Sequence, residues 1–134
     1  MTSDTGKSSI RLLLRLEGAL VACIGLYLFN RTSASWWLFA ALILAPDLSF
    51  AGYMRGTEFG ASVYNAAHTY LAPALLWTGM TVAGLPFADE LALIWIIHIG
   101  ADRLLGYGLK YADAFRHTHL SDAPGNAAQP RAST

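Results

Sequence analysis

Residues 85–107 read LPFADELALIWIIHIGADRLLGY, a largely apolar stretch in which His98 and Asp102 are embedded. A helix needs about 20 mostly apolar residues to cross a hydrocarbon layer of about 30 Å. Ionisable side chains at such a depth are rare, costly and usually functional. The stretch therefore predicts a membrane-spanning helix that carries two side chains with a chemical role.

Outside this stretch, the chain contains three more apolar segments of similar length. The predicted spans cover about residues 10–29, 36–53, 59–82 and 85–107, and short polar, Gly- or Pro-containing breaks separate them. Short connections make consecutive helices antiparallel neighbours. We therefore expect an all-α fold, a four-span transmembrane helix bundle with up-down topology.

These spans define the expected domain organisation. A cytoplasmic N-terminal segment covers residues 1–9, the transmembrane domain covers residues 10–111, and a cytoplasmic tail covers residues 112–134. After about residue 120 the tail is rich in Ala, Pro, Gly and Ser without an apolar period, a composition typical of disorder.

The composition agrees with a lipid environment. Of the 134 residues, 54% are hydrophobic and only 13% are charged, whereas a soluble domain carries about a quarter charged residues. The formal net charge of zero argues against a nucleic-acid partner. Cys23 is the single cysteine, which excludes an intrachain disulfide and a cysteine zinc cluster.

The basic residues predict the orientation. Of the nine Lys and Arg residues, only Arg31 falls on the side opposite the N-terminus. Because basic residues concentrate in cytoplasmic loops, we expect both termini in the cytoplasm of a multi-pass protein in the bacterial inner (cytoplasmic) membrane. A cleaved signal peptide ending at residues 33–35 is the alternative. Arg15 and Glu17 interrupt its apolar core, so we expect an uncleaved first helix.

Five ionisable side chains are predicted to share one depth in the inner half of the bundle. At a rise of 1.5 Å per residue, each lies roughly 7–14 Å from the inner end of its own helix. They are Glu17, Asp47, His68, His98 and Asp102. His98 and Asp102 are four residues apart and therefore share a helix face. We expect Pro46 to free the carbonyl of Leu42 beside Asp47, and so to help form a pocket.

Two histidines with two or three carboxylates are ligand types that bind zinc, iron or manganese in helical bundles. We expect Asp47, His68, His98 and Asp102 to bind a divalent transition metal such as zinc, with Glu17 as general base or fifth ligand. An open coordination position would activate water, so the leading hypothesis is a metal-dependent membrane hydrolase of a lipid or amphiphile. The remaining predicted binding residues are Asn65, Arg103, Tyr107 and Lys110, with Arg103 on an anionic head group.

Other functions stay open. The same side chains can form a network that only packs helices, in a non-catalytic scaffold or partner-binding subunit. They can also form a relay in a proton- or ion-coupled carrier, although the outer half of the bundle offers almost no polar path. His117 and His119 could fold back over the inner mouth and add ligands, and the sequence also allows a homo-oligomer.

Five segments carry a family resemblance: LLRLEG (13–18), WWLF (36–39), APDLS (45–49), YNAAHTY (64–70) and HIGADRLLGYGLKY (98–111). They resemble the family catalogued as domain of unknown function 4260, over about residues 11–120. The resemblance implies a small bacterial integral membrane protein and implies no activity. The Pro46-Asp47 pair and the histidines are also similar to those of predicted membrane-bound metal-dependent hydrolases, whose His-Arg-Gly-x-Thr-His-Ser motif is absent.

Overall fold

The computed structural model describes residues 2–112 and 118–120, with side chains from residue 6 onwards. The predicted disorder after about residue 120 lies outside this part of the chain. All named elements are helical, as predicted. They are α1 (Thr2–Arg31), α2 (Trp36–Leu42), the 3₁₀ helix η1 (Ala45–Arg55), α3 (Thr57–Ala67), α4 (Leu71–Val82) and α5 (Ala88–Leu105).

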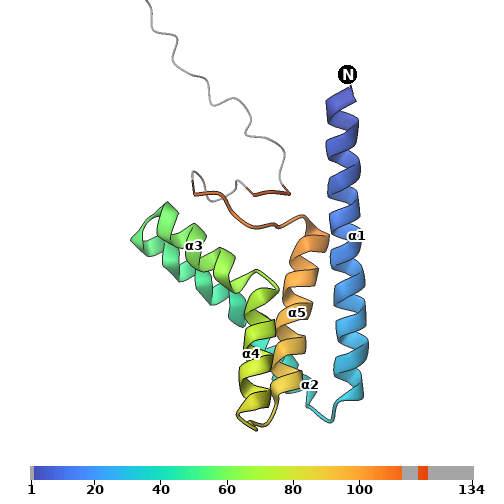
Figure 1. Ribbon diagram of the computed structural model, residues 1–134, viewed down its shortest axis with the longest axis vertical. Helices are drawn as coiled ribbons and strands as arrows, with labels where there is room; N and C mark the ends of the chain where they lie inside the picture. Colours follow the sequence, from blue (N-terminus) through green and yellow to red (C-terminus); the bar gives the residue numbers. More distant parts are fainter. Residues whose placement is uncertain (1, 113–117, 121–134) are drawn as a thin grey trace, which may run out of the picture.

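Two helices, α1 and α5, form the main packed pair, and α4 lies against α5 (Figure 1). Glycine makes the contact between α1 and α5 close. A Cβ atom added at Gly100 would lie 2.8 Å from the carbonyl oxygen of Gly18 and 3.0 Å from the backbone nitrogen of Ala22. Small residues are typical of helix contacts in membranes, because they let the backbones approach.

Gly100→Val is expected to lower the melting temperature, because the new side chain would press on backbone atoms of α1 that cannot rotate away. Overpacking of this kind typically destabilises by about 1–3 kcal/mol. Gly79→Val is the matched control, since Gly79 is also inside a helix and a Cβ atom there meets nothing within 4 Å. Thermal unfolding followed by circular dichroism checks this, and equal melting temperatures for the two variants would contradict it.

The second unit is an antiparallel hairpin of η1 and α3, which inclines away from α1 and α5 (Figure 1). Gly56 makes the turn between them with φ +116°, a backbone conformation that favours glycine. Gly60 of α3 faces the ring of Tyr53, and Gly52 of η1 faces Val63. These glycines let the two helices pack closely, and we refer to the unit as the η1–α3 hairpin.

The third predicted span is interrupted. Instead of one helix over residues 59–82, α3 ends at Ala67 and α4 begins at Leu71. Side chains from α5 bind the carbonyl groups at the break: Trp95 Nε1 donates to the carbonyl of Ala67 at 2.7 Å, and Arg103 donates to that of His68 at 3.3 Å. Protein partners therefore satisfy the backbone carbonyl groups that the break leaves without a helical hydrogen bond.

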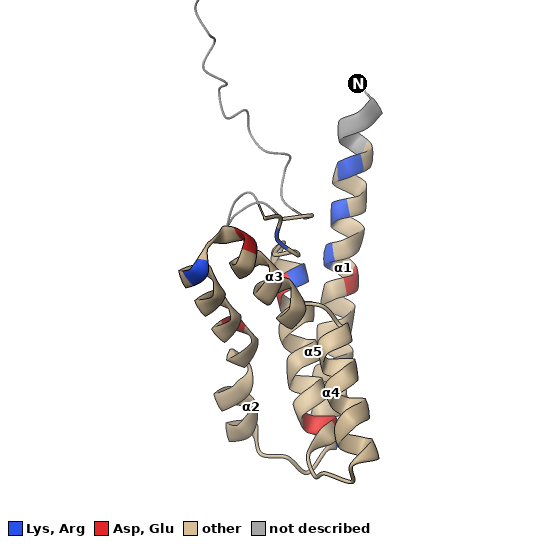
Figure 2. Cartoon of the chain, turned by 60° about the vertical axis from the view of Figure 1, so that its left-hand side comes forward, with Lys and Arg blue, Asp and Glu red and all other residues tan. Residues whose placement is uncertain are grey.

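Two helical segments, Gly6–Arg31 and Trp36–Arg55, are long and apolar enough to cross a membrane, and Leu71–Val82 is a shorter apolar helix. Many large apolar side chains face outward, among them Leu12, Leu13, Leu16 and Leu20 of α1, each more than half exposed. Most of the Lys and Arg positions gather in the half of the molecule that holds the start of α1 and the end of α5 (Figure 2). Four spans and their orientation stay predictions.

Candidate metal centre

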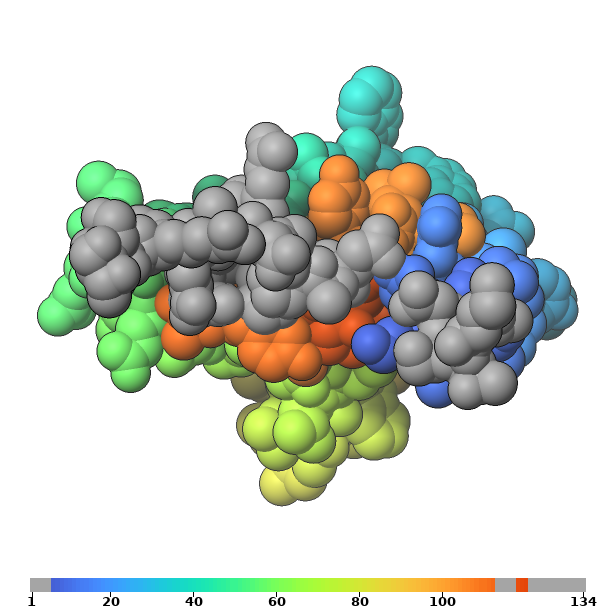
Figure 3. All heavy atoms as spheres, turned by 90° about the horizontal axis from the view of Figure 1, so that it is seen from above, coloured from blue at the N-terminus to red at the C-terminus, as the bar shows by residue number. Residues whose placement is uncertain are grey.

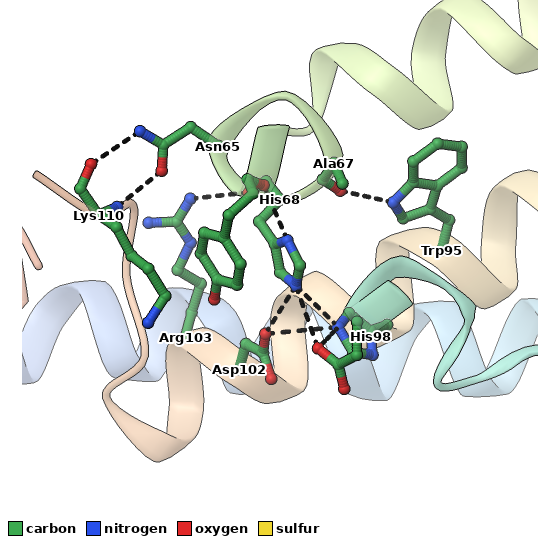
Figure 4. A network of polar contacts seen from close by, with 10 residues as sticks. Asn65, Ala67, His68, Trp95, His98, Asp102, Arg103 and Lys110 are labelled. Carbon is green, nitrogen blue, oxygen red and sulfur yellow. Dashed lines mark hydrogen bonds and ion pairs between the residues drawn. The ribbon is translucent and has the colours of Figure 1, made fainter. Parts of the chain in front are cut away.

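Four of the five predicted side chains meet at one point. Asp47 comes from η1, His68 from the break after α3, and His98 and Asp102 from α5 (Figure 4). Each offers one ligand atom, and these four atoms all lie within 4.8 Å of one another. Three segments that are distant in sequence therefore build one cluster, which we call the tetrad.

Five of the six separations within the tetrad are nearly uniform, and the sixth, between the two carboxylate oxygens, lies within 4.8 Å. His98 Nε2 lies 3.2 Å from His68 Nε2, 3.4 Å from Asp47 Oδ1 and 3.4 Å from Asp102 Oδ2. His68 Nε2 lies 3.4 Å from Asp47 Oδ1 and 3.5 Å from Asp102 Oδ2. A tetrahedral zinc ion with bonds of about 2.0–2.1 Å holds its ligand atoms about 3.3–3.4 Å apart. These five distances match five of the six edges of such a tetrahedron.

The hydrogen bonds of the histidines leave lone pairs pointing into the tetrad. His68 Nδ1 lies 2.9 Å from the carbonyl oxygen of Tyr64, so this nitrogen carries the hydrogen and donates it. In a neutral imidazole the other nitrogen, Nε2, is then an acceptor. The ring of His98 hydrogen-bonds the backbone of Ile43, while its Nε2 faces the tetrad.

With each histidine carrying its hydrogen on the ring nitrogen that faces away from the tetrad, four acceptor atoms converge. Protonating both histidines instead would set two N–H groups against each other at 3.2 Å. A cation at the centre satisfies all four lone pairs at once. Metal-binding histidines characteristically donate their second ring nitrogen to a carbonyl or carboxylate, which is the arrangement of His68.

Pro46 explains how His98 obtains its backbone partner. Proline has no N–H, and the backbone nitrogen of Asp47 donates to the carbonyl of Leu44 in the 3₁₀ pattern. In this pattern the carbonyl that Pro46 leaves free belongs to Ile43, three residues earlier. That Pro46 frees the carbonyl of Leu42, at the α-helical spacing of four residues, stays a prediction.

An aromatic stack holds the ring of His68. Tyr64 stacks on this imidazole with the ring centres 3.7 Å apart and the planes 13° from parallel. The ammonium nitrogen of Lys110 lies 4.7 Å from the centre of the Tyr64 ring. His68 and His98 are buried, whereas the side chains of Asp47 and Asp102 are 35% and 20% exposed. Access to the tetrad is therefore from the carboxylate side.

The predicted binding residues Asn65, Arg103, Tyr107 and Lys110 shape the surroundings of the tetrad. Asn65 Nδ2 donates to the carbonyl of Lys110 at 2.8 Å, and Asn65 Oδ1 accepts from its N–H at 2.7 Å. The side chain of Tyr107 is exposed, and its backbone N–H donates to the carbonyl of Asp102 at 2.8 Å. Asn65 thereby fastens the segment after α5, which lies across this end of the molecule (Figure 3).

We call this segment, residues 106–112 and 118–120, the strap. Within the strap, His119 packs against Leu109 and Arg103. The N–H of Leu109 donates to His119 Nδ1 at 2.8 Å, and Arg103 contacts His119 Nε2 at 2.8 Å. Burial and the Arg103 charge lower the pKa of His119, and burial lowers the pKa of Lys110. His119 thus folds back, as the sequence allowed, but onto Arg103 and Leu109. His117 lies outside the described residues.

Glu17 occupies a different place from the tetrad. Its side chain is exposed on α1 and lines a groove of about 320 Å³ that also contains Tyr70 and Arg103. Arg103 lies between the two places, since it also binds the carbonyl of His68. The role of Glu17 as general base or fifth ligand stays a prediction.

The comparisons with known proteins identify a family. A family model described as Domain of unknown function (DUF4260) matches residues 11–123, a range that includes the whole tetrad. No curated protein and no solved structure matches the chain.

Proposed function

The chain belongs to the family described as Domain of unknown function (DUF4260), and from its site we propose that it is a metal-dependent membrane enzyme, a hydrolase of a lipid or another amphiphile. The observation that carries this proposal is the tetrad: four lone-pair atoms with five of their separations between 3.2 and 3.5 Å. Zinc is the metal that this geometry favours, since it takes nitrogen and oxygen ligands tetrahedrally.

Charge balance supports a divalent ion. Two neutral imidazoles and two carboxylates carry a net charge of −2, which a divalent cation cancels. A buried charge without compensation is strongly unfavourable in a low-dielectric interior. Because the tetrad is partly buried, a divalent ion would stabilise its two negatively charged carboxylates.

The exposed carboxylate edge suggests how the centre would act. Asp47, His68, His98 and Asp102 would hold the ion, and water could reach it from the side of the exposed carboxylates. The ion would supply an activated water there, and an oxygen of Asp47 or Asp102 would be placed to accept its proton. The oxygen of this water would add to a carbonyl or phosphoryl centre of the substrate as the bond to the leaving oxygen breaks, and the same carboxyl group would return the proton to that leaving oxygen.

The groove of Glu17 and Arg103 is where we propose that a polar head group approaches. Arg103 carries a fixed positive charge beside the tetrad and lines this groove. An anionic head group would pair with it. Glu17, on the same groove, is the candidate for a second general base.

We propose a multi-pass placement in the bacterial inner membrane, with four membrane-crossing segments and both termini in the cytoplasm. Its support is the pair of long apolar helices, the outward-facing leucines of α1 and the basic residues gathered at one end. On this placement the break between α3 and α4 lies in a membrane-crossing segment, and the tetrad lies toward the inner leaflet.

The test is metal analysis coupled to an activity assay. Protein purified without chelators is expected to contain about one zinc ion, or another divalent transition-metal ion, per chain. In nanodiscs this protein is expected to hydrolyse an ester amphiphile such as p-nitrophenyl decanoate. Asp102→Asn should lose most of this turnover. Asp89→Asn should keep it, because Asp89 binds Trp77 Nε1 at 2.6 Å, away from the tetrad.

Two results would count against the proposal in different ways. Absence of stoichiometric metal would end it. Stoichiometric metal without turnover on carboxylic and phosphoric ester amphiphiles would make the centre structural and favour the scaffold function.

A further inference from the structure

An apolar cavity of about 320 Å³ adjoins the tetrad. Its walls come from α2, η1, α3, α4 and α5, and nearly all of the lining side chains are apolar. The volume is at the lower end of the range for small-molecule pockets, about 300–1,000 Å³. Size alone does not distinguish it, because another groove, beside Pro73 and Trp77, has a volume of about 470 Å³.

Proximity to the tetrad distinguishes this cavity. Each element that supplies a ligand also supplies a lining residue next to it: Pro46 precedes Asp47, and Ala67 precedes His68. On α5, Ile94 lies four residues before His98, one turn along the same face. The tetrad side chains do not line the cavity themselves, and these neighbouring lining residues place the cavity next to the tetrad.

Along α5, the cavity lies on the side of the tetrad that faces the start of the helix. The ligands His98 and Asp102 are in the second half of the helix, and the lining residues Leu91, Ile94 and Trp95 are in the first half. From His98 to Leu91 this is a length of roughly 10 Å at 1.5 Å per residue. In the proposed orientation, the cavity points from the inner leaflet toward the middle of the membrane, as the chain of an inner-leaflet amphiphile does.

One polar group in the wall lacks a partner. The hydroxyl oxygen of Ser49 is buried and has no hydrogen-bond partner among the residues that the structure describes. An unsatisfied buried hydroxyl is unfavourable, and Ser49 is only two residues from the ligand Asp47. A carbonyl oxygen of a bound molecule near the tetrad could accept its hydrogen.

We infer that this cavity, which we call the chain slot, binds one acyl or alkyl chain of the substrate while the hydrolysable head reaches the metal. The inference rests on the proposed metal-dependent function and narrows its substrate to a single-chain amphiphile. A second copy of the protein or a whole bilayer lipid with two chains does not fit a slot of this volume beside the ligands.

The experiment uses hydroxamates, whose oxygens bind zinc, as probes of the metal-loaded protein in nanodiscs. Acetohydroxamic acid tests the metal alone, and decanohydroxamic acid tests the metal and the slot together. Ala45→Phe fills the slot from an exposed position on η1. Ala74→Phe is the matched control, an exposed alanine of α4 that lines the other groove. Isothermal titration calorimetry gives the dissociation constants, and elemental analysis of the same samples gives the metal content.

Decanohydroxamic acid is expected to bind Ala45→Phe at least about tenfold more weakly than wild type, the equivalent of about two buried methylene groups. Acetohydroxamic acid should bind both proteins equally, and Ala74→Phe should match wild type with both probes. Leu91→Trp fills the slot from α5 and should repeat the result of Ala45→Phe.

Stoichiometric metal with unchanged decanohydroxamic acid binding in both slot variants would overturn the chain slot and leave the metal centre intact. Absence of metal in wild type would overturn the proposed function itself, and the chain slot with it.

Discussion

His98→Ala is expected to abolish stoichiometric metal binding. His98 Nε2 lies 3.2–3.4 Å from each of the other three ligand atoms, so it occupies a full corner of the tetrahedron. Loss of a residue that only supports a ligand already weakens metal binding about 10–100-fold. Loss of the ligand itself should therefore weaken it by more than about a hundredfold.

His119→Ala is the matched control for this variant. It removes an imidazole that binds Leu109 and Arg103 and leaves the tetrad whole. Elemental analysis after dialysis, followed by competition against a chromogenic zinc chelator, measures both variants. A His98→Ala protein that folds and retains the wild-type metal content would show that the tetrad does not hold the ion.

Removal of the metal is expected to lower the melting temperature of the wild-type protein strongly. An ion that binds only the folded chain stabilises it by about 4.1 kcal/mol when its free concentration is a thousand times the dissociation constant. The tetrad ties η1 and the α3–α4 break to α5, so the loss should be concentrated in the η1–α3 hairpin.

Thermal unfolding with and without a chelator checks this, and hydrogen exchange locates the change. Added zinc should restore the wild-type protein, while His98→Ala should respond to neither chelator nor zinc. If the melting temperature of metal-loaded wild type is the same with and without chelator, the ion does not contribute to stability and the prediction is wrong.

The sequence predicted the membership of the tetrad well. The i, i+4 spacing of His98 and Asp102 sets both on one helix face, and the depth of Asp47 and His68 brought them to the same level. Depth is a single coordinate, however. It places a residue along the helix axis and leaves its direction around that axis undetermined, which is why Glu17 shares the depth but faces the groove of Tyr70 and Arg103.

The break in the third predicted span has one signal in the sequence, Pro73, which has no N–H to donate to the carbonyl of Thr69 four residues earlier. Residues 67–71 themselves contain no glycine or proline, so the sequence does not fix where the helix ends. The carbonyl groups of Ala67 and His68 at the break are bound by Trp95 and Arg103, tertiary partners that the sequence does not reveal. The stacking of Tyr64 on His68 was not predicted, although the position of Tyr64 four residues before His68 was a usable signal.

The four ligands of the tetrad are divided between two units of the fold, and this division affects how fast a metal ion binds and leaves. Two ligands share one turn of α5, which packs along α1, while Asp47 and His68 belong to the η1–α3 hairpin and its end. We expect capture in two stages: α5 takes the arriving ion first, and the hairpin closes on it second. The opening of the hairpin then sets the residence time of the ion, so exchange can be slow even though two of the four ligands are partly exposed.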